Sequence, residues 1–345
     1  MRSEIGEIPG VVERVVTGAG TELPGVAHAI RWQRPAWAMI AGRGTSDHAA
    51  VYTQYLVETQ LGIPTGLVKP SVTTIYEASV AWRGGLVLAI SQSGQSPDVV
   101  AVVSAARAAG ALTVAITNDP GSPLAAAAEW SLDCHAGREL AVPATKTYVA
   151  ELATIASLVA AIGQTQELMA GLAALPEALR DTVARAESWL AGPGSGAVRA
   201  MAAADRALLV SRGYNLATAL ELALKLKETC GLFAEAYSTA DFAHGPLVLS
   251  QPGVPTLAIR PDGPMGLLVD ATLKAVTARG GSATVIGGAE AAAHSGALSL
   301  PAPLPESLTP LLYVVPGQLL VEAVARELGI SPDAPVGLGK VTRTR

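Results

Sequence analysis

The residue pattern with the clearest chemical meaning is a cluster of small hydroxyl residues and glycine, Ser91-Gln92-Ser93-Gly94-Gln95-Ser96. It follows an apolar segment and precedes Pro97 and Asp98, which suit a first helical turn with Ser96 as the N-cap. A helix N-terminus binds anions, most often phosphate, through backbone N–H groups and the helix dipole. The loop therefore predicts a phosphate site, with an ordinary capped strand–helix turn as the alternative. It lacks the Lys-Ser/Thr ending of a nucleotide P-loop, so we expect no nucleotide-bound magnesium.

A second small-residue segment, Gly42-Arg43-Gly44-Thr45-Ser46, occupies the same place after an earlier apolar run. Both segments would follow parallel strands, and open α/β sheets bind ligands at the carboxyl ends of their strands. A Gly-x-Gly pattern alone is weak evidence, and a plain turn is the alternative. The matching place in the second half reads Arg260-Pro261-Asp262-Gly263. We therefore expect one half to bind phosphate and the other to supply different groups.

A predicted helix, Asn215 to Thr229, carries charged residues that could transfer protons. Glu221, Lys225 and Glu228 lie at i, i+4 and i+7, on one helix face. The alternative is a solvated charged face with one Glu–Lys pair. Glu228 lies in the last turn, where the helix dipole disfavours a carboxylate and is expected to raise its pKa. A carboxylate tuned in this way suits proton transfer.

Two further single residues are candidates. His244 lies in Asp241-Phe242-Ala243-His244-Gly245-Pro246, which indicates a loop, and Lys340 lies in the tail segment Gly337-Leu338-Gly339-Lys340. A solvated loop histidine and a frayed terminus are the alternatives. No metal-ligand spacing and no Ser/His/Asp arrangement stands out, so we expect neither a metal nor an organic cofactor.

These residues need a scaffold, and the chain predicts one of alternating strands and helices. Apolar strand-like runs alternate with Ala-rich helical runs, which is typical of a parallel sheet covered by helices. The clearest elements are strands at Ala38–Ala41, Leu86–Ile90 and Leu112–Ile116, and helices at Asp47–Leu61 and Asp98–Ala109.

The same order recurs in the second half at a nearly constant offset. Arg43-Gly44 and Arg212-Gly213 are 169 residues apart, as are Ala89-Ile90 and Ala258-Ile259. This spacing predicts a duplicated domain rather than a solenoid repeat. Between the halves we expect a long helical stretch (146–190) and a Gly/Pro linker (191–196), and after them a last helix (317–328) and a tail.

The composition excludes several classes of protein. The chain has 345 residues, of which 50% are hydrophobic and 15% charged, with a net charge of −5. It is thus long enough for about two domains and is not intrinsically disordered. The acidic balance argues against bulk nucleic-acid binding. Cys134 and Cys230 are too few for a disulfide framework. The longest apolar stretch, Tyr148 to Ile162, contains Glu151 and falls short of a membrane span. The N-terminus lacks a signal peptide, so we expect a cytoplasmic protein.

Several segments together resemble the sugar isomerase (SIS) domain family, specifically its tandem-domain members. The isomerase half of glucosamine-6-phosphate synthase and the SIS-type glucosamine-6-phosphate deaminases are the nearest matches in pattern. The segments follow the family's order and are ARGTSDHAA from Ala41, AISQSGQSPD from Ala89, HAGRELAVPATKT from His135, SRGYNLATALELALKLKE from Ser211, AEAYSTADFAHGPL from Ala234 and LGKVT from Leu338.

The resemblance implies an α/β fold of two tandem SIS domains, each a parallel sheet flanked by helices in a flavodoxin-like three-layer sandwich. We expect an N-terminal helical segment (1–27), a phosphate-binding domain (28–190), a domain with the glutamate helix and histidine loop (197–330) and a tail (331–345). It also implies a homodimer that binds a sugar phosphate, with no nucleic-acid or membrane partner.

Roles follow from the same resemblance. The positions that match phosphate-binding residues are Ser46, Ser91, Gln92, Ser93 and Ser96. The positions in the segment that lines the sugar are Val142 and Thr145. Glu228 matches the glutamate that moves a proton between C1 and C2, and Lys225 its neighbouring lysine. His244 matches the histidine that helps open the sugar ring, reaching in from the other protomer. Lys340 matches the tail lysine at C1 and C2.

Two departures from the synthase bear on the reaction. The chain begins at the sugar half, so we expect no use of glutamine through a glutaminase domain. Ala144 also replaces a serine of the synthase, which, with GRGTSDHA and GKVT, is more similar to the deaminases. The resemblance thus implies a glucosamine-6-phosphate deaminase/isomerase. A dehydratase of N-acetylglucosamine 6-phosphate and a non-catalytic sugar-phosphate sensor are the alternatives.

Overall fold

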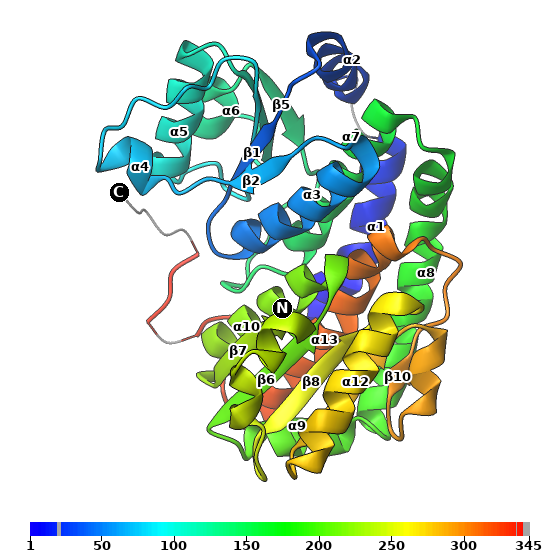
Figure 1. Cartoon of the computed structure of the whole chain (residues 1–345). Coiled ribbons are helices and arrows are strands. Elements are labelled where there is room, and N and C mark those ends of the chain that lie inside the picture. The colour runs from blue at the N-terminus through cyan, green and yellow to red at the C-terminus, as the bar shows by residue number, and fades with distance from the viewer. Residues whose placement is uncertain (19–21, 336, 341–345) are drawn as a thin grey trace. The chain divides into compact units, whose positions relative to one another are not determined.

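The computed structural model describes residues 1–18, 22–335 and 337–340 and contains two parallel sheets with flanking helices (Figure 1). These residues pack into two compact units. The first-sheet unit comprises 10–139, 146–173 and the tail from Gly339, and the second-sheet unit comprises 1–9, 140–145 and 174–338. Short segments of each sequence half therefore belong to the unit of the other half, namely 1–9 and 140–145 in the second-sheet unit and the segment from Gly339 in the first-sheet unit.

The first sheet has five parallel strands in the order β2-β1-β3-β4-β5. Its strands are β1 (Ala38–Ala41), β2 (Thr65–Leu67), β3 (Leu86–Ser91), β4 (Leu112–Thr117) and β5 (Trp130–Asp133). Every residue of β3 and β4 is buried, as expected for central strands covered on both faces.

Helices cover both faces of this sheet (Figure 1). Neighbouring helices on one face are α2 (Leu23–Gln33), α3 (Thr45–Leu61) and α7 (Lys146–Gly163). Those on the other are α4 (Ser71–Thr74), α5 (Pro97–Ala108) and α6 (Pro123–Ala127). Val99, Val102 and Val103 of α5 pack on Val87 and Ala89 of β3 in one core cluster.

The second sheet repeats the first. Its five parallel strands run in the order β10-β9-β8-β6-β7, which is the order of the first sheet when each half is numbered from its own first strand. They are β6 (Arg206–Ser211), β7 (Phe233–Ser238), β8 (Pro255–Arg260), β9 (Ser282–Gly287) and β10 (Leu298–Ser299). The matching topology confirms the internal duplication predicted from the offset.

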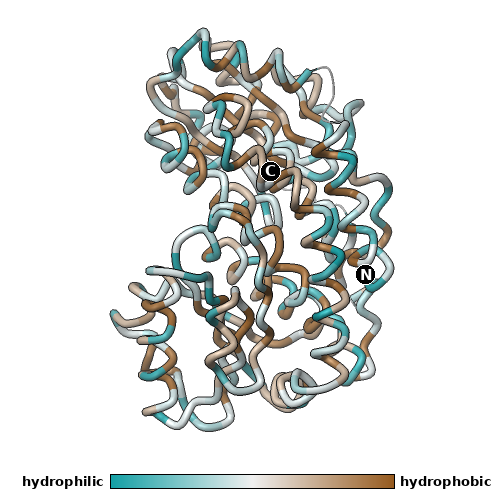
Figure 2. The backbone as a smooth tube through the Cα atoms, turned by 90° about the vertical axis from the view of Figure 1, so that its right-hand side faces the viewer, coloured by the Kyte–Doolittle hydropathy of each residue, from teal (hydrophilic) through white to brown (hydrophobic). Residues whose placement is uncertain are grey.

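The second sheet is also covered on both faces. Helices on one side are α9 (Ser195–Ala202), α10 (Leu216–Cys230) and α13 (Thr309–Glu327). Those on the other are α11 (Thr239–Ala243) and α12 (Pro264–Ala278). Short 3₁₀ turns lie at Gly213–Asn215, Pro246–Leu249, Ala289–Ala293 and Glu306–Leu308. Along the chain, brown and teal stretches alternate within helices, as expected for helices with one buried and one exposed face (Figure 2).

The remaining helices differ in detail from the prediction. α1 spans Arg2–Gly18, and the long helical stretch is divided into α7 and α8 (Gln166–Ala191). The break lies at Gln164, whose backbone has a left-handed φ of 51°. α13 begins at Thr309 rather than at 317 because Pro316 is accommodated inside the helix. The predicted Gly/Pro linker corresponds to the short break between α8 and α9.

Two helices are long and apolar enough to cross a membrane, at Lys146–Gly163 and Glu306–Glu327. The prediction judged the first stretch too short, but the helix extends beyond it at both ends. Of the 18-residue windows tested, 78% and 94% respectively are buried inside the protein. Both therefore have the character of core helices.

The strand order places the candidate loops at a reversal point of the first sheet. β1 and β3 are neighbours, and the chain leaves them toward opposite faces through the turns that follow Ala41 and Ser91. Ligands of open α/β sheets bind outside the carboxyl ends of such strands. The two segments singled out in the sequence thus lie at the position where this architecture binds ligands.

Candidate functional site

The serine loop, residues 91–96, is held in a compact turn between β3 and α5. The Gly94 N–H donates to the Ser91 Oγ at 3.1 Å, and the Gln95 N–H donates to the Ser93 Oγ at 3.3 Å. Ser96 is the N-cap residue of α5, as predicted, with Pro97 in the first turn. Its hydroxyl makes no capping hydrogen bond to the helix. The loop therefore has the backbone form of an anion site at the start of a twelve-residue helix.

Gly94 is required by the close approach of another element. Its φ is 59°, and a Cβ built there would lie 2.1 Å from the Oγ of Ser122. Ser122 is buried and caps α6 through its Oγ, which accepts from the Ala125 N–H at 3.3 Å. The loop and the start of α6 are thus in van der Waals contact, which fixes the loop's shape.

The Gly42–Ser46 turn is tied directly to the helix that follows the serine loop. The Arg43 guanidinium forms an ion pair with Asp98, with N–O distances of 2.7 and 2.6 Å. The Asp98 side chain is fully buried. A Cβ at Gly42 would lie 2.4 Å from the Ser46 carbonyl oxygen, so only glycine fits this turn. The two predicted loops are therefore adjacent.

Ser46 faces a buried carboxylate. Its Oγ donates to Glu151 Oε1 of α7 at 2.9 Å, and both residues are buried. The same carboxylate, together with burial, holds the pKa of the Cys134 thiol well above its usual range, burial being the larger cause. Cys134 is therefore an inert core residue, and Glu151 is a buried neighbour of the candidate site that the sequence analysis did not single out.

A second buried carboxylate joins the serine loop to the C-terminal tail. Glu139 Oε2 accepts from the Gln92 Nε2 at 2.7 Å and forms an ion pair with the Lys340 Nζ at 3.0 Å. Glu139 Oε1 accepts from the Thr147 N–H at 3.3 Å. The Glu139 side chain has no exposed surface, whereas 25% of the Lys340 side chain is exposed. Val341 and Thr342, which complete the tail motif, lie outside the described residues.

Val142 and Thr145 belong to the second-sheet unit, although they precede α7 in the chain. The Val142 N–H donates to the Asp333 carbonyl at 2.9 Å, and the Thr145 carbonyl accepts from the Gln318 Nε2 at 3.3 Å. Thr145 is fully buried and Val142 is half-buried. The segment predicted to line the sugar is thus anchored to the unit that carries Glu228.

The charged row on α10 is buried, so a solvated face is the wrong interpretation for two of its members. The side chains of Lys225 and Glu221 are 1% and 0% exposed, and that of Glu228 is 28% exposed. The Lys225 Nζ lies 2.6 Å from Glu228 Oε2 and 3.4 Å from Glu221 Oε1. Burial lowers the pKa of Lys225, but the two carboxylates more than offset it and the net shift is upward.

This geometry suits a proton-transfer group. Lys225 remains an ammonium, and its Nζ lies directly against the Glu228 carboxylate. Of the three side chains, Glu228 alone has substantial exposure, so it is the one that can meet a ligand.

His244 is exposed and follows a short helix. It is the C-cap residue of α11, and its N–H donates to the Asp241 carbonyl at 3.1 Å. Asp241 in turn is hydrogen-bonded to Ser238, with the hydroxyl donating at 2.6 Å. The second-sheet unit thus contains both His244 and Glu228, while the first-sheet unit contains Ser46, the serine loop and Lys340.

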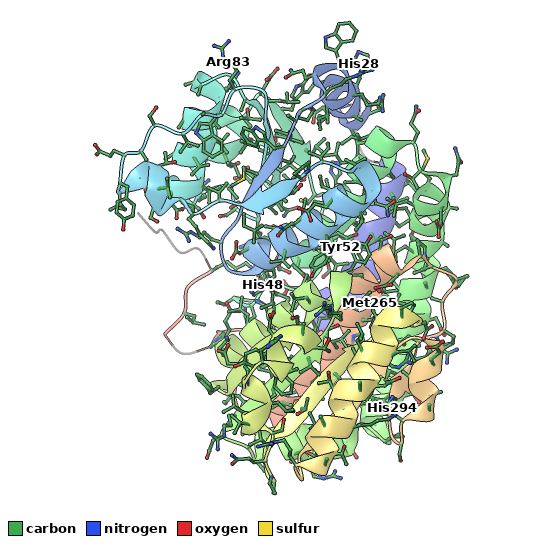
Figure 3. All side chains as sticks on the ribbon, in the orientation of Figure 1. His28, His48, Tyr52, Arg83, Met265 and His294 are labelled. Carbon is green, nitrogen blue, oxygen red and sulfur yellow. The ribbon has the colours of Figure 1, made fainter. Side chains whose placement is uncertain are left out.

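The second half has an ion cluster where the first half has its serine loop. Arg260, the last residue of β8, has a 4% exposed side chain that pairs with Asp270 at 2.8 Å and Glu290 at 2.9 Å. The Nε2 of His294, labelled in Figure 3, lies 2.9 Å from Asp270 Oδ1. The second sheet thus has a buried arginine surrounded by carboxylates at the place where the first sheet has its serine loop. The two halves therefore differ in structure at this position, and phosphate binding by the first half stays a prediction.

Comparison with known proteins agrees with this architecture. Two stretches of the chain, 37–161 and 200–319, match the SIS domain model. The glutamine–fructose-6-phosphate aminotransferase (isomerizing) of Methanothermobacter thermautotrophicus is 36% identical over 307 residues, covering 86% of this chain and 50% of the relative. The chain therefore spans about half the length of such curated relatives.

Solved structures agree as well. A protein of Silicibacter pomeroyi DSS-3, provisionally named a phosphosugar isomerase, is 36% identical with a TM-score of 0.86, covering 96% of this chain and 99% of that one. The glucosamine-6-phosphate deaminase of Thermotoga maritima shares the fold at 23% identity and a TM-score of 0.74, covering 97% of this chain and all of the deaminase chain. The chain belongs to the SIS domain family, with two SIS domains in tandem.

Proposed function

We propose that the chain is a glucosamine-6-phosphate deaminase/isomerase that works by ring opening and proton transfer between C1 and C2. The observation that carries the proposal is the Lys225–Glu228 pair, in which a partly exposed carboxylate lies 2.6 Å from a buried ammonium. A non-catalytic sugar-phosphate sensor would need the serine loop but not this pair.

The ligand would be anchored through its phosphate on the serine loop, with Ser46, Ser91, Gln92, Ser93 and Ser96 as its contacts. Val142 and Thr145 would line the sugar. Backbone N–H groups at the start of α5 attract the phosphate, which compensates for the net charge of −5.

The chemistry follows from the groups available. His244 helps open the sugar ring, giving the C1 aldehyde. Glu228 takes the C2 proton, which that carbonyl acidifies, and returns it to C1. With a free amine on C2 the product is an imine. One water molecule then hydrolyses this imine, which gives fructose 6-phosphate and ammonia. Lys340 assists at C1 and C2 as an ammonium.

The choice of deamination rests on sequence features rather than on the fold. Ala144, in place of the synthase serine, and the segments GRGTSDHA and GKVT resemble the deaminases. Ala144 also allows a different C2 substituent. If that substituent is N-acetyl, imine hydrolysis is blocked, and loss of the C3 hydroxyl from the same intermediate would make the protein a dehydratase.

The proposed function also requires a particular oligomeric state and a location in the cell. Two chains form a homodimer in the cytoplasm, and His244 serves the site of the partner subunit. Light scattering combined with activity measurements tests this, because an active monomer is incompatible with a role for His244 across an interface.

Proton NMR in D₂O tests the reaction, with glucosamine 6-phosphate and N-acetylglucosamine 6-phosphate supplied separately. We expect loss of the C2 proton signal, ammonia and fructose 6-phosphate from the first sugar. If only the acetylated sugar reacts and a new vinylic signal appears, the protein is a dehydratase and not a deaminase. If neither sugar reacts or exchanges protons, the proposed function is wrong for both.

Glu228→Gln is the decisive variant. We expect it to lower kcat by about 10³-fold or more while ligand binding persists, because the amide cannot accept the C2 proton. Glu235→Gln is the matched control, since this 39% exposed glutamate pairs with Lys227 on the same helix. Unchanged turnover in Glu228→Gln would refute the assignment.

A further inference from the structure

We propose that Glu139 is a positioning residue that holds Lys340 and Gln92 in fixed relation to each other. The proposal rests on the function proposed above, in which Lys340 acts at C1 and C2 and Gln92 contacts the phosphate. Glu139 itself touches neither end of the sugar. It would act by fixing the groups that do.

The contacts of one oxygen carry the inference. Glu139 Oε2 accepts from both the Gln92 Nε2, at 2.7 Å, and the Lys340 Nζ, at 3.0 Å. The Gln92 Nε2 also lies 3.3 Å from the Thr147 Oγ1, and Glu139 Oε1 accepts from the Thr147 N–H. One carboxylate therefore connects the serine loop, the start of α7 and the tail.

Burial explains why this connection is strong. The Glu139 side chain has no exposed surface, and a buried carboxylate without a cation and hydrogen bonds is costly. Lys340 supplies the cation from a tail segment that belongs to the first-sheet unit. The charge requirement of Glu139 thus gives Lys340 a defined place.

The arrangement has a functional meaning beyond folding. Phosphate and the C1/C2 end are at opposite ends of a hexose phosphate, so the groups that bind them must keep a fixed separation. Gln92 and Lys340 are far apart in sequence but share one oxygen atom. A displacement of about 1 Å in such positioning groups is enough to lower turnover markedly.

Glu139→Gln tests the proposal because a glutamine side chain cannot replace all the contacts that the two carboxylate oxygens make. If the amide oxygen faces Gln92 and Lys340, the amide NH₂ faces the Thr147 N–H, donor against donor. In the opposite orientation the NH₂ faces the Lys340 ammonium. Either way Lys340 loses its ion pair with Glu139. Glu177→Gln is the matched control, since the Glu177 side chain is 83% exposed.

We expect Glu139→Gln and Lys340→Met each to lower kcat for the sugar phosphate by about 10–100-fold. The double variant should lie within about threefold of the slower single variant, because both changes break the same unit. Effects that multiply in the double variant would overturn the positioning role, as would unchanged turnover in Glu139→Gln.

A measurement without substrate separates this proposal from the proposed function. Trypsin must take the lysine side chain into its own pocket, so Lys340 is protected while it pairs with Glu139. We expect cleavage after Lys340, followed by intact mass, to be at least about tenfold faster in Glu139→Gln than in the wild type or Glu177→Gln. Equal rates would overturn the link whatever the activity, whereas an inactive wild type would refute the proposed function.

If Glu139→Gln fails to fold, Lys340→Met tests the same pair from its exposed side. We expect its Tm to be lower than that of the wild type at pH 8, with the deficit shrinking toward pH 5. Protonation of Glu139 then removes the uncompensated charge. An unchanged Tm at both pH values would show that Lys340 does not serve Glu139.

Discussion

Replacing Gly94 by alanine tests how the serine loop is fixed. Two costs follow from the structure. The φ of 59° is a left-handed conformation, which costs an L-residue about 1–2 kcal/mol. The new Cβ would also lie 2.1 Å from the Oγ and 2.4 Å from the Cβ of Ser122, so one of the two elements must move. Overpacking of this kind typically costs about 1–3 kcal/mol.

The displaced group adds a third cost. Ser122 caps α6, and loss of a cap costs about 1 kcal/mol. Together these effects predict a loss of about 3–6 kcal/mol for Gly94→Ala. At about 2–4 °C per kcal/mol for a unit of this size, Tm should fall by roughly 6–24 °C. Affinity for a hexosamine 6-phosphate should fall as well, because the loop that would hold the phosphate is displaced.

Thermal unfolding followed by circular dichroism, with calorimetric titration of the sugar phosphate, measures both effects. Gly110→Ala is the control, since its φ of 84° is also left-handed but a Cβ there meets nothing within 4 Å. It should lose only about 1–2 kcal/mol and keep its affinity. If Gly94→Ala is no less stable than Gly110→Ala, contact with Ser122 does not shape the loop.

Two further predictions concern charge. Lys225→Met should cost about 3–5 kcal/mol in denaturant unfolding, because it leaves Glu221 buried without its cation. Its stability relative to the wild type should recover as the pH falls, and a deficit that does not depend on pH would contradict this. Hydrogen bonds from Arg260, opposed by burial, lower the pKa of Asp270. Its stabilisation is therefore present above about pH 3.9 and is lost as pH falls through the lowered pKa. In acid unfolding, the Asp270→Asn variant should therefore not show the loss of stability that protonation of Asp270 causes in the wild type. An acid transition identical to that of the wild type would show that the Arg260–Asp270 pair adds no stability.

The scaffold could be predicted from sequence because its signals are local. The apolar runs of β1, β3 and β4 end within one residue of their predicted limits. The helices after β1 and β3 likewise begin within two residues of prediction. Glycine and proline mark the turns, and a constant offset marks the duplication. Each of these signals lies within a few residues of the element it predicts.

The carboxylates around the first sheet could not be predicted in this way. Glu139 meets Gln92 and Lys340, which are 47 and 201 residues away, and Glu151 meets Ser46 across 105 residues. Only the three-dimensional fold brings such partners together. The available signal was weak, namely single charges in otherwise apolar or small-residue segments.

The charged row of α10 shows a different difficulty. Spacing identifies residues on a common face but does not say whether that face is buried. Lys225 and Glu221 are buried, and they compensate each other's charge. A lysine between glutamates has the same sequence pattern on a surface helix as in a core, so only the packing of α10 on α13 decides between them.

The order of the chain within the two units has a consequence for folding during synthesis. The first-sheet unit takes most of its residues from 10–173 but also includes the tail from Gly339. The ribosome must therefore complete the whole second sheet before Lys340 exists to neutralise Glu139. Until that moment the Glu139 carboxylate in the interior of a nascent first sheet has its hydrogen bonds from Gln92 and Thr147 but lacks the ion pair with Lys340. Proper closure of the first-sheet unit thus depends on a residue that is translated only after the whole second sheet.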